Sequence, residues 1–136
     1  PKNFLMIGGV VLVVVGIAGM AGIIGPTPAQ SIFGDLWWFD DAENWAPLVL
    51  GIAALAIAVA LPVLQAPITL IVGMLGLAVG VWGFVSSDLL GAMLENPADN
   101  ILHLAVGAWA IASWMKGQKS ASSSSMSPTA PMRPPM

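Results

Sequence analysis

The single histidine of the chain, His103, offers the widest choice of chemistry. It lies in the apolar segment 100–112, and Asp99 precedes it by one helical turn. A polar residue inside a membrane span is a functional candidate. An imidazole can be the axial ligand of a tetrapyrrole such as haem or (bacterio)chlorophyll, and Trp109 and Trp114 could flank such a ring. It can also relay protons, although the sequence offers no second relay group within the spans.

A structural role for His103 is the interpretation that we favour. In the second turn of a helix near the outer interface, His103 would hydrogen-bond to Asp99, Asn100 or a loop carbonyl and fix the outer loops. Nothing indicates an enzyme, because the chain has no cysteine and suggests no Ser–His–Asp arrangement. A metal site would need more ligands than one histidine and scattered loop acids, and the charge pattern excludes nucleic acid. We therefore expect no cofactor, apart from the pigment or haem that His103 could bind.

The composition points to a membrane. Of 136 residues, 57% are hydrophobic and 8% are charged, whereas soluble domains carry about 25% charged residues. All four Lys and Arg residues lie near the chain ends, and all seven Asp and Glu residues fall in two internal segments. Since cytoplasmic segments are enriched in Lys and Arg, we expect an even number of spans, cytoplasmic termini and acidic loops outside.

Four mostly apolar runs are long enough to cross a hydrocarbon core of roughly 30 Å at about 1.5 Å per residue. The predicted spans are residues 4–25, 46–64, 68–85 and 97–115. Pro62 and Pro67 bracket a predicted tight inner turn, which makes the second and third spans antiparallel neighbours. The expected fold is all-α, an integral membrane four-helix bundle. A low-complexity Ser/Pro/Met-rich tail, residues 117–136, follows on the cytoplasmic side and is expected to lie along a partner.

The spans repeat. Segments 42–56 and 98–112 match at a spacing of 56 residues, with identical pairs Ala42/Ala98, Asn44/Asn100, Leu48/Leu104, Gly51/Gly107, Ala54/Ala110 and Ala56/Ala112. The preceding spans match at a spacing of 57, with pairs Val15/Val72, Gly16/Gly73, Gly19/Gly76 and Ala21/Ala78, and the same spacing carries Phe33-Gly34 onto Leu90-Gly91. We interpret the chain as two tandem two-span repeats, residues 1–60 and 61–116. The motif positions of the repeat are Asn44, Gly51, Asn100 and Gly107.

Two groups of residues are candidates for interfaces. In the first outer loop, Trp37, Trp38 and Trp45 would anchor the chain at the membrane boundary or form a docking surface for a neighbouring subunit. In the third span, the glycines at 73, 76, 80 and 83 share one helix face. Such a stripe allows close backbone approach in lipid. We expect it to serve internal packing, with a surface for another subunit as the alternative.

The two units, together with the pattern N-x-x-H-L-x-x-G at Asn100, His103, Leu104 and Gly107, resemble a family of four-span bacterial membrane proteins of unknown function. The resemblance covers roughly residues 4–115. It implies a four-helix membrane bundle in the bacterial inner (cytoplasmic) membrane and brings no established activity. Members of that family often carry the histidine in the first repeat as well, where this chain has Pro47. A role that needs two histidines is therefore not supported.

These observations favour a non-enzymatic accessory or scaffolding subunit of a larger membrane complex. Its partners would be the lipid bilayer and other integral membrane subunits. Energy conversion, respiratory or photosynthetic, is expected from the frequency of such assemblies among native membrane complexes and not from particular residues. The alternative is a tetrapyrrole-binding protein that uses His103. A small transporter or channel is disfavoured, because four spans with few polar groups offer no evident pathway.

Overall fold

The computed structural model describes residues 1–39, 41–89, 92–93 and 97–125. These residues are mostly helical, which confirms the all-α class. The elements, in chain order, are α1 (Lys2–Met20), η1 (Pro28–Gln30), η2 (Gly34–Leu36), α2 (Asp41–Ala60), α3 (Pro62–Trp82), β1 (Asp88–Leu89), β2 (Ala92–Met93) and α4 (Ala98–Ser125). Within the described residues, three segments are long and apolar enough to cross a membrane: Lys2–Met20, Glu43–Ala60 and Pro62–Trp82.

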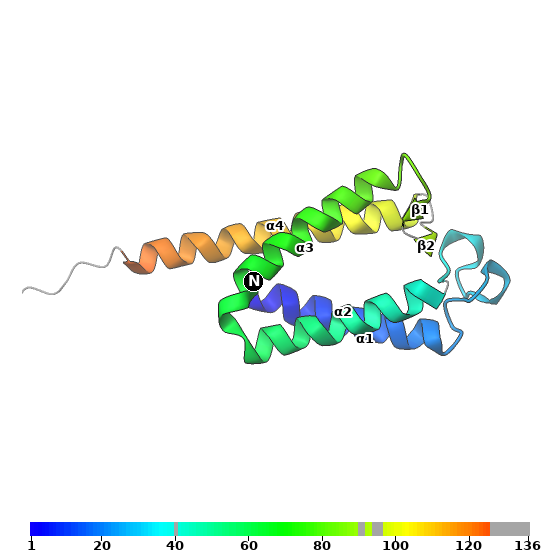
Figure 1. The fold of residues 1–136 in the computed structure, drawn as a ribbon, viewed down its shortest axis with the longest axis horizontal. Helices are drawn as coiled ribbons and strands as arrows, with labels where there is room; N and C mark the ends of the chain where they lie inside the picture. Colours follow the sequence, from blue (N-terminus) through cyan, green and yellow to red (C-terminus); the bar gives the residue numbers. More distant parts are fainter. Residues whose placement is uncertain (40, 90–91, 94–96, 126–136) are drawn as a thin grey trace, which may run out of the picture.

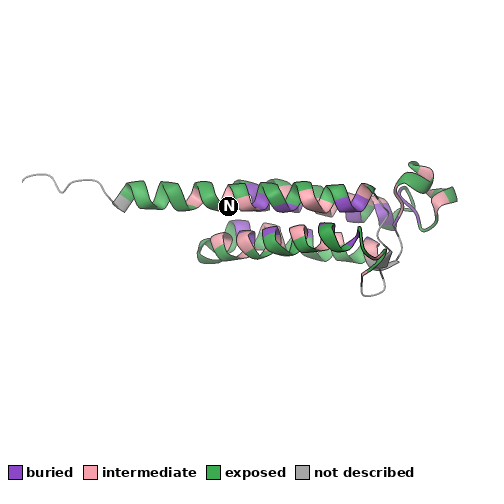
Figure 2. Cartoon of the chain, turned by 90° about the horizontal axis from the view of Figure 1, so that it is seen from above, coloured by how far each residue is buried: buried purple, intermediate pink, exposed green. Residues whose placement is uncertain are grey.

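The four helices form two antiparallel pairs. α1 packs along α2, α3 packs along α4, and most contacts between helices are made within these pairs (Figure 1). The start of α1 lies at the same end of the molecule as the turn between α2 and α3, and the longer connections lie at the opposite end. Exposed residues dominate the outward surfaces of both pairs (Figure 2).

α1 ends earlier than the sequence suggested, at Met20 and not at residue 25. Gly22 has a φ of 74°, a left-handed conformation that glycine adopts without a steric penalty. The N–H of Ile23 donates to the carbonyl of Ala18 over 2.9 Å, and that of Gly22 donates to Gly19 over 2.9 Å. This pair of bonds is a Schellman cap, which satisfies the last carbonyls of the helix and stops it before Pro26.

The predicted inner turn at residues 62–67 is also wrong. Leu61 alone separates α2 from α3, and Pro62 occupies the first position of α3. Proline is favoured there because its missing N–H would have no helical partner. Pro67 lies inside α3, one turn further on. The Gln65 side chain donates from Nε2 to the carbonyl of Ala58 over 2.9 Å, which satisfies a carbonyl near the end of α2.

The fourth helix is longer than the predicted span 97–115, since α4 continues to Ser125. The predicted tail was assigned from its low complexity, but residues 117–125 contain no proline and only one glycine. Serine hydroxyls in this stretch donate to carbonyls of their own helix, including Ser124 Oγ to Ser120 over 3.0 Å. The first nine positions of the predicted tail are therefore helical, and residues 126–136 lie outside the described part.

The second long connection contains a short hairpin that the sequence did not indicate. β1 and β2 pair antiparallel, with Asp88 opposite Met93 and Leu89 opposite Ala92. The expected match of Phe33-Gly34 with Leu90-Gly91 lies outside the described residues.

A small apolar core joins the two helix pairs near the α2–α3 turn. Its fully buried members are Phe4, Leu5, Ala58 and Ala110, one or two from each of three helices. Ile68 and Val72 of α3 pack against them. Phe4 also meets Trp109 edge to face, with ring centroids 4.8 Å apart. All four helices are thus tied together at this end of the molecule.

Candidate functional site

His103 lies in the second turn of α4 and is half-buried. Its Nδ1 is 2.7 Å from the main-chain carbonyl oxygen of Asp99, four residues earlier. A carbonyl only accepts, so Nδ1 donates in this contact and Nε2 is not used in it. The partner of His103 is therefore the backbone of its own helix, one of the possibilities that the sequence left open.

The carboxylate of Asp99 has a different partner. Trp37, at the end of η2, donates from Nε1 to Asp99 Oδ1 over 2.8 Å, and Asp99 is buried. Phe39 meets Trp37 edge to face with centroids 5.1 Å apart, and the Phe33 ring is tilted against Trp37 with centroids 5.5 Å apart. This cluster links the first outer connection to the start of α4. It joins the two helix pairs at the end opposite the apolar core.

The three candidate tryptophans of the first outer segment therefore have different surroundings. Trp37 and Trp38 are both half-buried, Trp37 is bonded to Asp99 and contacts the two phenylalanines, and Trp45 is 57% exposed. A docking surface that uses all three stays a prediction. Trp45, near the start of α2, is the member that faces outward.

The glycine stripe of α3 is covered by α4. Each of its four glycines faces a particular residue of α4: Gly73 faces Ile111, Gly76 faces Gly107, Gly80 faces Leu104 and Gly83 faces Asn100. A Cβ on Gly76 would lie 3.1 Å from the Cα of Gly107, and one on Gly80 would lie 2.7 Å from Leu104 Cγ. The stripe is thus used for packing within the pair, and it is not available to another subunit.

The first helix pair makes matching contacts. Gly9 of α1 faces Gly51 and Leu55, Gly16 faces Leu48, and Gly19 faces Asn44. Gly51 in turn approaches the carbonyl of Gly9, as Gly107 approaches the carbonyl of Gly73. A Cβ on Gly51 would lie 2.8 Å from the Gly9 oxygen, and one on Gly107 would lie 3.0 Å from the Gly73 oxygen.

By these contacts, Gly9 of the first unit is equivalent to Gly73 of the second, Gly16 to Gly80 and Gly19 to Gly83. The equivalent glycines are 64 residues apart in the sequence. The sequence suggested a spacing of 57 for the first helix of each unit, which is seven residues less than the spacing of 64 that the contacts give. Seven residues are close to two helical turns, so both spacings place glycines on the same face. For the second helix of each unit, the spacing of 56 agrees with the contacts.

The two motif asparagines occupy equivalent places. Asn44 and Asn100 are both buried, and each packs against the last glycine of the neighbouring helix, Gly19 or Gly83. Within the described residues, Asn44 Oδ1 and both amide atoms of Asn100 have no hydrogen-bond partner. Sequence reasoning singled out both residues as repeat positions and Asn100 also as a possible partner of His103, but it did not identify their glycine partners.

Two further findings concern metal binding and similarity to known proteins. Among the described residues, no group of three or more His, Cys, Asp or Glu side chains lies close enough to hold a metal ion. Comparison of the chain with protein-family models, with curated proteins and with solved structures gave no match. The function must therefore be argued from the arrangement of the helices themselves.

Proposed function

We propose that the chain is an integral membrane protein with four spans, built from two tandem two-span units. α4 is less apolar than the other helices because polar residues lie at both of its ends, Asp99, Asn100 and His103 in the first turns and Lys116, Gln118, Lys119 and several serines in the last turns. Yet it packs along α3, a candidate span, through the same kind of glycine contacts that join α1 to α2. Because α4 packs along a candidate span, we propose that the predicted fourth span, residues of about 97–115, crosses the bilayer as well.

Charge supports the proposed orientation. Lys2 begins α1, and Lys116 and Lys119 lie in the last part of α4, whereas Asp35 lies in η2, Asp88 in β1 and Asp99 at the start of α4. The start of α1 lies at the same end of the molecule as the α2–α3 turn, and the longer connections lie at the opposite end. By the positive-inside rule the basic end is cytoplasmic. In a bacterial inner membrane both termini would then be inside and the acidic connections outside.

Within the membrane we propose a non-enzymatic role, as an accessory or scaffolding subunit of a larger complex. The observation that carries this proposal is the division of the helix surfaces. The small and polar faces, with their glycines and asparagines, are used between paired helices. Only 28% of the α1 window and 17% of the windows in α2 and α3 is buried within the chain. The remaining apolar surface is free for lipid and for the spans of partner subunits, with Trp45 at its outer edge.

The complex would be one of energy conversion, respiratory or photosynthetic. The test is the native mass of the untagged protein, extracted from its own membranes in mild detergent, with partner chains identified by mass spectrometry. We expect a large, defined assembly that is weakened by Trp45→Ala and retained by Trp45→Phe. A species of one or two copies of the 14.0 kDa chain would overturn the proposal.

One observation favours a second candidate, a tetrapyrrole-binding protein. The bond from His103 Nδ1 to a backbone carbonyl leaves Nε2 as the free nitrogen. Metal-binding histidines commonly have this arrangement, with the other ring nitrogen donating to a carbonyl. Absorbance recorded on the same native peak tests the idea. A chromophore that is lost in His103→Ala supports axial ligation, and a chromophore that the variant keeps rules it out.

A further inference from the structure

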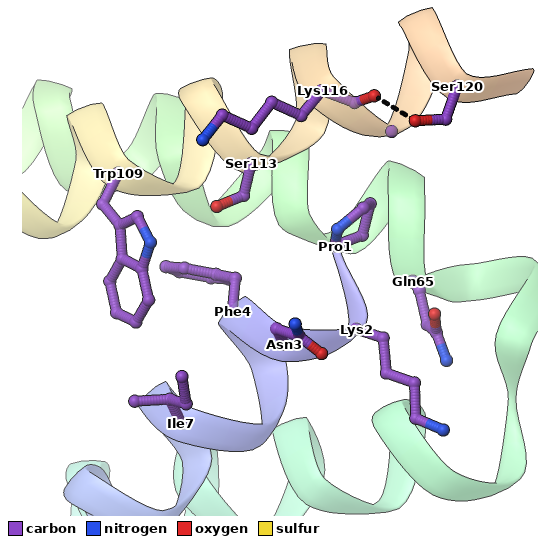
Figure 3. Close-up of a pocket in the computed structure, with 11 residues that line it drawn as sticks. Pro1, Lys2, Asn3, Phe4, Ile7, Gln65, Trp109, Ser113, Lys116 and Ser120 are labelled. Carbon is purple, nitrogen blue, oxygen red and sulfur yellow. Dashed lines mark hydrogen bonds between the residues drawn. The ribbon is translucent and has the colours of Figure 1, made fainter. Parts of the chain in front are cut away.

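A pocket of about 520 Å³ lies at the basic end of the molecule, away from His103. It opens between the first turns of α1, the start of α3 and the last turns of α4 (Figure 3). Its apolar part is formed by Phe4, Ile7 and Trp109. Its polar part is formed by the side chains of Lys2, Asn3, Gln65, Ser113, Lys116 and Ser120. The pocket therefore combines an apolar wall with a polar, basic rim.

Charge is concentrated at this pocket. Two of the four Lys and Arg residues of the chain, Lys2 and Lys116, line it. They come from different helices, and in Figure 3 they lie on opposite sides of the pocket, Lys116 near Ser113 and Lys2 near Gln65. None of the described lining residues is acidic. An anion between the two ammonium groups would be attracted by both.

The extension of α4 beyond the predicted span is what completes the pocket. Ser120 Oγ donates to the carbonyl of Lys116 over 3.1 Å, within the part of α4 that continues past residue 115. Gly117 lies against Pro1, and a Cβ at position 117 would come within 2.7 Å of the proline ring. The close approach at Gly117 therefore brings Lys116 and Ser120 over the start of α1.

We propose that this pocket binds the phosphodiester head group of an anionic phospholipid from the cytoplasmic leaflet. The inference goes beyond the accessory role and rests only on the membrane-spanning part of the proposed function. Basic pockets between spans on the cytoplasmic side are suited to anionic head groups, and ligand pockets have volumes of about 300–1,000 Å³. Ile7 is 54% exposed and Trp109 is 40% exposed, so acyl chains can continue from the pocket along an apolar surface. An indole also suits the boundary between head groups and acyl chains.

The test uses the full chain, reconstituted in bilayer discs that contain equal parts of phosphatidylglycerol and phosphatidylcholine. Lipid that remains bound after transfer to detergent is then quantified by mass spectrometry. Lys2→Gln and Lys116→Gln each remove one cation from the pocket. Lys119→Gln is the matched control, because it removes the same charge from the next turn of the same helix, at a residue that does not line the pocket. A parallel binding measurement with inorganic phosphate tests a soluble anion.

We expect preferential retention of phosphatidylglycerol, reduced about five-fold by Lys2→Gln or Lys116→Gln and less than about two-fold by Lys119→Gln. Equal losses of bound phosphatidylglycerol in Lys116→Gln and Lys119→Gln would mean that the lipid is held by the general positive charge of the surface, which would overturn the proposal. Lack of any preference for phosphatidylglycerol would do the same. Binding of inorganic phosphate that competes with the lipid and needs Lys116 would overturn the lipid assignment in favour of a soluble phosphate.

Failure of this inference can be told apart from failure of the proposed function. Resistance of the protein to alkaline extraction from membranes measures spanning, independently of any lipid preference. A chain that resists extraction but shows no lipid preference would contradict only the head-group site. A chain that alkali extracts would contradict the membrane topology itself.

Discussion

The two helix pairs are alike where helices touch and different where they are connected. In both, an asparagine packs against the last glycine of the neighbouring helix. Seven residues after each asparagine, Gly51 or Gly107 approaches a backbone carbonyl of that neighbouring helix. The described parts of the connections differ, because the first contains the 3-10 helices η1 and η2, whereas β1 and β2 pair in the second. Position 47 is proline in the first pair, and the corresponding position 103 is histidine in the second. The two pairs therefore share their helix-to-helix packing, whereas the connections differ, and the first connection also links the pairs through the bond from Trp37 to Asp99.

The largest expected effect comes from filling the shared glycine contact. Gly51→Leu and Gly107→Leu should each lower the free energy of unfolding by about 3 kcal/mol, because the new side chain meets backbone atoms that cannot move aside. Reversible unfolding in mixed micelles, followed by circular dichroism, measures this loss. Gly8→Leu is the control, since nothing lies within 4 Å of its Cβ position, and it should change stability by less than about 0.5 kcal/mol. A clear difference between the Gly51 and Gly107 variants would break the equivalence of the two pairs.

A smaller effect is expected where the pairs are joined at their acidic end. Trp37→Phe removes the donor to Asp99 and should lower the free energy of unfolding by about 2 kcal/mol, as a buried charged acceptor loses a partner. Trp45→Phe, at an exposed position, should have little effect in the same assay. Equal losses from the two variants would indicate that the Trp37–Asp99 bond does not connect the pairs in the membrane.

The aromatic contact at the basic end should contribute less. A double-mutant cycle with Phe4→Leu and Trp109→Leu should give a coupling of about 1 kcal/mol from the edge-to-face pair. Phe4 and Trp45 lie at opposite ends of the molecule and provide the control cycle, which should give no coupling. Additive effects of Phe4 and Trp109 would mean that the pairs associate through the aliphatic core alone.

The smallest effect is expected at position 103, where the matching position 47 of the first pair is proline. His103→Leu should lower the free energy of unfolding by only about 0.5 kcal/mol. The Asp99 carbonyl loses the bond from the imidazole, but it still accepts a hydrogen bond within the helix backbone. The same unfolding assay applies, with Leu102→Ala as a neighbouring exposed control. A loss of more than about 2 kcal/mol would show that His103 does more for the second pair than Pro47 does for the first.

The sequence predicted the all-α class and the approximate position of every helix, because apolar runs, proline and glycine report on local structure. It could not predict the spacing of 64 between Gly16 and Gly80, because a shift of seven residues leaves glycines on the same helix face. The predicted fourth span ends at residue 115 while α4 continues to Ser125, because the stretch from Gln118 to Ser125 lacks helix breakers. The partners of Trp37 and the pocket at Lys2 and Lys116 depend on residues distant in the chain, which spacing alone does not bring together.

The single residue Leu61 between α2 and α3 has a consequence for the order of synthesis. Every glycine contact of the first pair lies before it in the chain, so α1 and α2 can close on each other before α3 has been made. The second pair then enters the bilayer beside a finished hairpin, tethered to it by one residue. Phe4 and Leu5 of α1 can pack with Ala110 only after α4 has been made. The contact between α1 and α4 therefore forms later than the glycine contacts of the first pair.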